Sequence, residues 1–241
     1  MPRMHTAWRV LPHRPLAQLS ERVWRLEGDL EGMPMKRVMT IARRGDGGLV
    51  VHNAIAADDP AMAAIAGLGE IRAILVPNGY HRLDAKVFHE RFPAAQVICP
   101  AGARAKVEQV VPVNATYAEV ASDGAVELQT IDGTKGREGA MIVRDGDGTT
   151  LVLNDLVFNM PHVPGAQGFV LKHIMGSSGG VKITRIARML VISDKRAARA
   201  HLERLAALPE LRRVIVSHHE IIDREPEREP GRVLAEVAAT L

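Results

Sequence analysis

The chain has 241 residues, of which 46% are hydrophobic and only 3% aromatic, and its 31 Lys or Arg exceed its 28 Asp or Glu to give a net charge of +3. This length suits one large domain or two small ones around an aliphatic core. The two signs of charge are mixed, without a basic block or an aromatic ladder, and this pattern argues against nucleic-acid binding.

The single cysteine, Cys99, excludes an internal disulfide and favours a reducing compartment. No uncharged apolar run approaches the length that spans a bilayer, and the N-terminus lacks the apolar segment of a signal peptide. We therefore expect a cytoplasmic protein with no membrane partner.

The first half of the chain alternates strand and helix patterns. Residues 1–20 are basic and interrupted by proline, which predicts a loosely attached N-terminal arm in front of a single domain at 21–241. Asp58-Asp59-Pro60 is typical of a helix start. The expected strands are 23–26, 37–42, 49–51, 73–76 and 97–99, and the expected helices begin at 58, 83 and 102.

The second half of the chain repeats this alternation of strand and helix patterns. Strands are expected at 126–131, 140–143, 151–153 and 214–216, and helices at 197–208 and 230–241. A glycine-containing loop is expected from 160 to 182. Two rounds of hairpins followed by helix and strand predict an α+β fold, a four-layer αββα sandwich of two mixed sheets with helices outside.

Asp155 is the most informative residue, because it interrupts the apolar stretch 149–158. A buried carboxylate must be paired, hydrogen-bonded or bound to a metal, since isolation costs several kcal/mol or more. Three other apolar runs end in polar side chains, and strands that each deliver a polar group at one end can form a shared site. These side chains are His52, Asn53, Asn78, His218 and His219.

Four segments resemble the metallo-β-lactamase fold superfamily. Residues 50–54 resemble its first Asp-Thr-Gly-type turn, 74–81 the strand before its His-x-His-x-Asp-His motif, 151–158 its Gly-Asp strand and 214–219 its last ligand-bearing strand. The opening, 32–52, is more specifically similar to an uncharacterised branch with a degenerate metal motif. The resemblance implies the αββα fold and, where the motif is intact, a two-zinc site that activates water.

This chain departs from the motif at most ligand positions. Asn78 and Tyr80 stand where the family has its first two histidines, Arg82 where it has the water-handling Asp, and Leu83 where it has the last His. The mid-chain Gly-His-Thr of the family is represented by 133–135, Gly-Thr-Lys. The resemblance therefore predicts the fold without the usual two-zinc chemistry.

Two interpretations of the remaining polar residues stay open. In one, His81, Asp155 and His218 hold a single zinc, iron or manganese ion, with His81 and Asp155 catalytic. In the other, no metal binds, and Asp155 is held by Asn154, by backbone donors or by Arg82. Further ligands in the first interpretation would come from His52, Asn78, Glu138 and His219.

Three functions follow from these interpretations. The chain is a metal-dependent hydrolase of a small ester or thioester, a metal-free binding protein, or an interaction module that uses the glycine-rich segment 165–180. The expected partner is a small molecule, which would be anionic if Arg82, Lys135 and Arg137 line the cleft. Fold alone does not decide among them, because function resides in the site.

Overall fold

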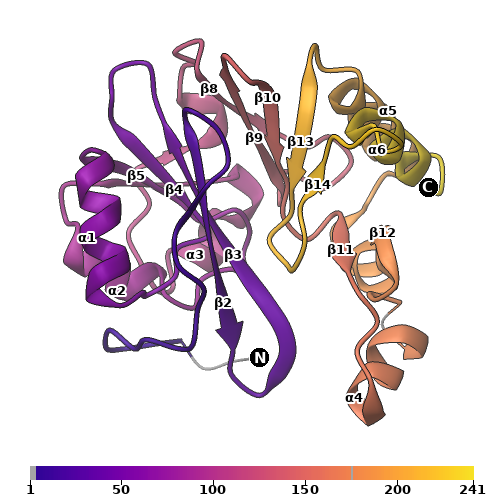
Figure 1. Ribbon diagram of the computed structural model, residues 1–241, viewed down its shortest axis with the longest axis horizontal. Coiled ribbons are helices and arrows are strands. Elements are labelled where there is room, and N and C mark those ends of the chain that lie inside the picture. Colours follow the sequence, from indigo (N-terminus) through magenta and orange to yellow (C-terminus); the bar gives the residue numbers. More distant parts are fainter. Residues whose placement is uncertain (1–3, 175) are drawn as a thin grey trace.

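Two β-sheets face each other across an apolar core in the computed structural model of the chain, which describes residues 4–174 and 176–241. Helices α1 and α2 lie outside the first sheet, and helices α5 and α6 lie outside the second (Figure 1). The arrangement confirms the predicted α+β sandwich with four layers.

The first sheet follows the order of the sequence. Its first four strands are antiparallel neighbours, and its last four are parallel, with the chain crossing through helices between them. The strands are β1 (Ala17–Gln18), β2 (Val23–Leu30), β3 (Met33–Arg43), β4 (Leu49–His52), β5 (Ile71–Leu75), β6 (Gln96–Cys99) and β7 (Ala115–Thr116), and the helices are α1 (Asp59–Leu68), α2 (Ala85–Arg91) and α3 (Arg104–Val107).

The second sheet has the strand order β14-β13-β10-β9-β8. Its β10 and β13 are parallel, and the remaining neighbours are antiparallel. Among the described residues, no helix is long and apolar enough to cross a bilayer. The elements are β8 (Val126–Thr130), β9 (Gly139–Asp145), β10 (Gly148–Val152), β13 (Leu211–Ile215), β14 (Ile222–Asp223), α5 (Lys195–Ala206) and α6 (Pro230–Ala238).

The segment expected to be a loop, 160–182, carries regular structure of its own. A small two-stranded sheet joins β11 (Phe158–Met160) to β12 (Gly180–Lys182). Between them lie α4 (Gly165–Phe169) and a π-helical turn, η3 (Val170–Ile174), and a second π-helical turn, η4 (Ala187–Val191), follows. These pieces are too short for their hydrophobic spacing to show a period, so the sequence does not reveal them.

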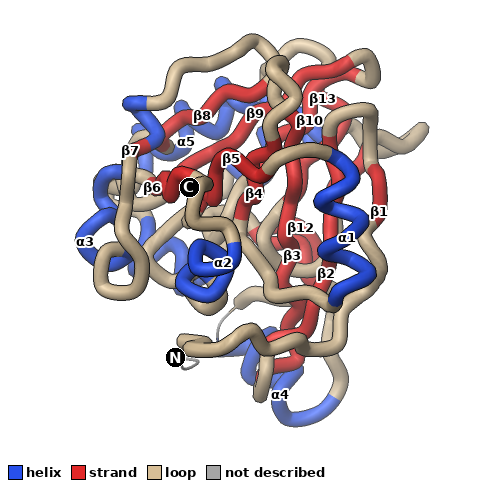
Figure 2. Tube along the Cα trace, turned by 90° about the vertical axis from the view of Figure 1, so that its left-hand side faces the viewer, coloured by secondary structure: helices blue, strands red, loops and turns tan. Residues whose placement is uncertain are grey.

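The core consists of three apolar layers. Between the sheets, Val38 and Leu75 of the first sheet pack with Met141 and Val152 of the second. Outside the first sheet, Ile65 of α1 and Phe88 of α2 cover its other face. Leu202 of α5 and Leu234 of α6 cover the second sheet. Figure 2 shows α1 and α2 on the same face of the first sheet. Burial on both faces explains the nearly continuous hydrophobic runs of β4 and β5.

The N-terminal arm is attached more firmly than expected. The Trp8 indole donates a hydrogen bond to the Ala57 carbonyl oxygen over 2.9 Å, and its ring stacks on Phe88 with centroids 5.6 Å apart. His5 Nδ1 lies 2.6 Å from Asp84 Oδ1, and β1 pairs with β2. The expectation of a loose arm is therefore wrong for residues 4–20.

Replacement of Trp8 by alanine tests this attachment. Loss of the stacked ring should lower the free energy of unfolding by about 2 kcal/mol, less than for a fully buried tryptophan because Trp8 is half-buried. Val10→Ala is the control, because Val10 is 44% exposed and should change the free energy by under about 0.5 kcal/mol. Equal urea midpoints for Trp8→Ala and the wild type would contradict docking of the arm.

Candidate functional site

The polar site lies at the carboxyl ends of parallel strands in both sheets. His52 ends β4 and Asn53 follows it, while the loop after β5 carries Asn78 and His81. Asp155 lies three residues after β10, and His218 three residues after β13. Because β4 and β5 are parallel, as are β10 and β13, their carboxyl ends point the same way within each sheet. Such strand ends form a crevice in open α/β sheets.

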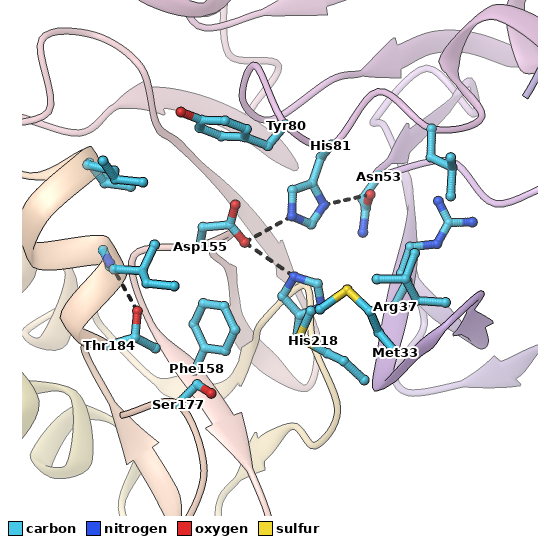
Figure 3. Close-up of a pocket in the computed structure, with 17 residues that line it drawn as sticks. Met33, Arg37, Asn53, Tyr80, His81, Asp155, Phe158, Ser177, Thr184 and His218 are labelled. Atoms are coloured by element: carbon cyan, nitrogen blue, oxygen red, sulfur yellow. Dashed lines mark hydrogen bonds and ion pairs between the residues drawn. The ribbon is translucent and has the colours of Figure 1, made fainter. Parts of the chain in front are cut away.

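The centre of the site is Asp155, which lies between two histidines (Figure 3). Asp155 Oδ1 is 2.9 Å from Nε2 of His81 and 3.3 Å from Nε2 of His218. Ligand atoms of all three side chains lie within 4.8 Å of one another, and the two imidazole rings are 5.0 Å apart. The structure thus brings together the three residues predicted to hold a metal.

Asn53 fixes the orientation of the His81 ring. Its amide nitrogen donates to the Val38 carbonyl oxygen over 2.8 Å, so its Oδ1 faces His81 Nδ1 at 2.9 Å. Nδ1 must therefore donate, and in the neutral ring Nε2 carries a lone pair. Asn53 has a φ of 56°, in the left-handed region that Asn tolerates better than most residues.

His218 is oriented in the same way by a backbone group. Its Nδ1 lies 2.9 Å from the carbonyl oxygen of Lys36, on β3 of the first sheet. A carbonyl oxygen only accepts hydrogen bonds, so Nδ1 carries the hydrogen and Nε2 faces Asp155. The Phe158 ring stacks on the outer side of His218 with centroids 5.0 Å apart and restricts its rotation.

These tautomers point three electron-rich atoms at one place. Two bare Nε2 atoms and a carboxylate oxygen repel one another unless a proton or a cation lies between them. Burial alone would raise the pKa of Asp155, but a proton on His81 and a hydrogen bond from His218, in the form that carries a hydrogen at Nε2, outweigh burial and hold this pKa well below its ordinary value. Asp155 is therefore ionised, and the cluster is stable only with a proton or a cation among its three atoms.

Asn78 separates Asp155 from a second buried carboxyl group. Its amide nitrogen donates to Asp155 Oδ2 and to Glu138 Oε1, both over 2.7 Å. Burial and the negative charge of Asp155 raise the pKa of Glu138 well above its ordinary value, so Glu138 is protonated and neutral. Asn154, predicted as a partner of Asp155, donates instead to Glu138 over 3.4 Å.

Two further histidines lie near the cluster but outside it. His52 is buried and neither ring nitrogen has a hydrogen-bond partner; burial, reinforced by His81, lowers its pKa to about 3. His219 points away and accepts a hydrogen bond from the Lys36 amide over 3.3 Å. The sequence predicted His218 as a ligand and His219 as a possible further one, and the structure places His218 but not His219 in the cluster.

The three predicted anion-binding cations do not line the cavity. Arg82 donates to the Lys106 carbonyl oxygen and to Gln109, and does not pair with Asp155, so its expected role as the counter-charge of Asp155 is wrong. Lys135 and Arg137 are exposed. The cation that does line the cavity is Arg37, whose guanidinium pairs with buried Asp84.

The cluster opens into a cavity of about 340 Å³, within the usual range for small-molecule pockets. Its wall is mostly apolar and comes from β2, β3, β11 and η4. Tyr80 lies at its edge, 40% exposed, with Lys106 Nζ 4.3 Å above its ring. The apolar lining residues are Leu30, Met33, Met35, Leu83, Phe158, Ile186, Ala187, Leu190 and Val191.

Sequence reasoning missed the residues that orient the site. Asn53 was noted only as the end of a strand, and the Lys36 carbonyl oxygen leaves no trace in the sequence because every residue has one. Arg37 begins the expected strand 37–42 and Phe158 ends the apolar stretch 149–158, so neither position indicates a site residue. The one usable signal was Asn after an apolar strand, because Asn favours positive φ.

Comparison with solved structures identifies the fold. A metallo-β-lactamase from Pontibacter korlensis matches with a TM-score of 0.60 at 11% identity, covering 94% of this chain and 99% of its own. The metallo-β-lactamase FIM-1 from Pseudomonas aeruginosa, solved in a mono-zinc form, matches with a TM-score of 0.59 at 13% identity, covering 96% of both chains.

A metallo-β-lactamase from Erythrobacter litoralis, solved with β-mercaptoethanol in its active site, gives a TM-score of 0.61 at 13% identity, covering 94% of this chain and 96% of its own. No protein-family profile and no curated sequence matches the chain. The chain has the metallo-β-lactamase fold, as the resemblance predicted. Sequence identities this low establish a shared fold and not a shared function.

The low pKa of His52 predicts a specific acid sensitivity. Unfolding raises this pKa from about 3 to about 6.5, so the unfolded state takes up a proton, and stability present above pH 6.5 is lost as the pH falls towards 3. When the pH is lowered from about 7 to about 4.5, the free energy of unfolding of the wild type should fall by about 2 to 3 kcal/mol more than that of His52→Leu. Exposed His173→Leu is the control, and equal losses in all three proteins would disprove burial of a neutral His52.

Proposed function

We propose that His81, Asp155 and His218 hold one divalent metal ion, and that the chain hydrolyses an uncharged ester or thioester with an apolar acyl group. The observation that carries the proposal is the direction of the two imidazoles. Each donates its Nδ1 hydrogen to a fixed acceptor and so presents Nε2 to the same carboxylate oxygen.

The donor set fits such an ion. Two histidines and a carboxylate are the protein ligands of many single-zinc hydrolases and of non-haem iron(II) sites, which keep further positions open. Metal-binding histidines usually donate their second N–H to a carbonyl or carboxylate oxygen, as His81 and His218 do to Asn53 and Lys36. Within residues 4–174 and 176–241 this is the only such cluster, which favours one ion over two.

When bound, a divalent ion would act as a Lewis acid that polarises a carbonyl group and lowers the pKa of water. The chain's own groups supply the rest. Asp155 is the only carboxylate among the described lining residues, so it is the group available to accept a proton from an attacking water. Asn78 holds Asp155 Oδ2, and the apolar wall excludes bulk water from the acyl group.

One observation favours the alternative, a binding protein without metal. The distances of 2.9 and 3.3 Å from the two histidines to Asp155 also suit N–H···O hydrogen bonds, provided that the imidazoles are protonated at Nε2. In that form the cluster needs no metal, and the cavity would bind an apolar ligand without turning it over.

Metal analysis separates these functions. After loading with zinc, iron(II) or manganese and removal of excess, the wild type should retain about one equivalent by elemental mass spectrometry. Asp155→Ala should weaken binding by more than about 100-fold, since loss of an outer partner alone costs 10- to 100-fold.

His219→Asn is the matched control, because it alters the neighbouring histidine, keeps a hydrogen-bond acceptor and tolerates the φ of 62° found there. It should keep one equivalent. Metal far below one equivalent in the loaded wild type would eliminate the hydrolase and leave the metal-free function.

The apolar wall predicts a preference for longer acyl chains. With chromogenic esters, kcat/KM of the metal-loaded protein should rise from acetate to octanoate, by up to about fourfold per methylene while the chain stays in the cavity. Met33→Trp, at the cavity wall, should lower kcat/KM for octanoate at least tenfold and leave acetate within about twofold. Absence of turnover with one bound ion would refute hydrolysis and retain metal binding.

A further inference from the structure

A stretch of 38 residues carries positive charge without any negative charge. From Leu156 to Ser193 the sequence has four Lys or Arg and no Asp or Glu, in a chain that otherwise mixes both signs. The hydrogen bonds of Lys182, Arg185 and Arg188 go to neutral oxygens, on Ser178, His173 and Thr240 respectively, and Lys172 is exposed. Their charges therefore remain available to an anionic surface.

The same stretch exposes large apolar side chains. On α4 and η3, Phe169 is 61% exposed and Ile174 62%, and on the neighbouring η4 Met189 is 80% exposed. The hydrogen bond from Arg185 to the His173 carbonyl oxygen, over 2.8 Å, ties the two turns together. Figures 1 and 2 both show α4 at the edge of the molecule, away from the two large sheets. The remaining exposed apolar residues here are Val170, Ile186 and Leu190.

This apolar surface continues into the cavity. Ile186 and Leu190 are 40% and 53% exposed, yet both also line the cavity that ends at Asp155. A molecule that covers the outer surface of η4 would therefore meet the cavity mouth. The continuity favours an occupant with apolar chains over a folded acidic protein.

We propose that α4, η3 and η4 dock onto a lipid surface rich in anionic headgroups, with Phe169, Ile174 and Met189 entering the interface and the cations lying over the headgroups. Exposed apolar side chains beside unpaired cations are the composition of interfacial segments. The proposal departs from the expectation of no membrane partner, which concerned spanning segments and signal peptides.

A second copy of the chain is a poorer occupant. In a two-fold symmetric contact the same surface meets itself, and the four cations would face four identical cations without an acidic group from this segment to offset them. Self-association is nevertheless an outcome that the experiment detects.

The test is sedimentation of the full chain with vesicles of phosphatidylcholine alone or with about 30% phosphatidylglycerol. The bound fraction should be at least fivefold higher on the anionic vesicles and should fall as salt rises, because the Debye length shortens. The triple variant Phe169→Ser, Ile174→Ser, Met189→Ser should reduce binding at least tenfold. Lys172→Glu should reduce it at least fivefold.

Lys86→Glu is the matched charge control, because Lys86 is exposed on α2, on the opposite side of the molecule from α4 in Figure 1, and it should bind like the wild type. Thermal unfolding followed by circular dichroism checks that every variant has the melting temperature of the wild type. Equal binding to both vesicles, no binding, or a loss in Lys86→Glu equal to that in Lys172→Glu would overturn the proposal. A dimer in analytical ultracentrifugation that the triple variant abolishes would overturn it in favour of self-association.

Discussion

The contact between ionised Asp155 and the two imidazoles, which a proton or a cation between them makes attractive, holds the site together. His81 comes from the loop after β5 of the first sheet, and Asp155 and His218 come from loops of the second. The contact therefore joins the two halves of the sandwich at one edge. A buried carboxylate without these partners would be destabilising by several kcal/mol, so the loop conformations, the tautomers and the cavity floor all depend on this contact.

The sequence predicted the parts of this arrangement that follow from periodicity and burial cost. Hydrophobic runs located the long strands, and an acid inside an apolar stretch located Asp155 as the centre. By resemblance the sequence favoured His218 over the adjacent His219, but it gave no physical reason why His218 turns inward. That choice depends on a φ of 62° at His219 and on a carbonyl oxygen of β3, which are set by long-range packing. The attachment of residues 4–20 was missed for the same reason, since Trp8 finds Phe88 across 80 positions of chain.

The sequence also did not predict that the cavity is lined mainly by apolar side chains. Three cations near the expected rim suggested an anionic ligand, but Arg82, Lys135 and Arg137 lie outside the cavity, and short apolar segments that had no readable period form much of its wall. Charge near a site in sequence says little about charge inside it, because long cationic side chains reach solvent easily while Leu and Ile do not. The lining of the cavity therefore favours an apolar ligand, in place of the anionic ligand that the sequence suggested.

Asn78 supports the cluster with an uncharged side chain. By resemblance it occupies the position of a ligand histidine, yet here its amide nitrogen donates to Asp155 and Glu138, and its oxygen accepts from the amides of Tyr80 and His81. Every hydrogen-bonding capacity of the side chain is used. Burial and the charge of Asp155 raise the pKa of Glu138, and the hydrogen bond from Asn78 offsets only part of this rise. Asn78 thus holds Asp155 Oδ2 and leaves Oδ1 as the single focus of the two imidazoles.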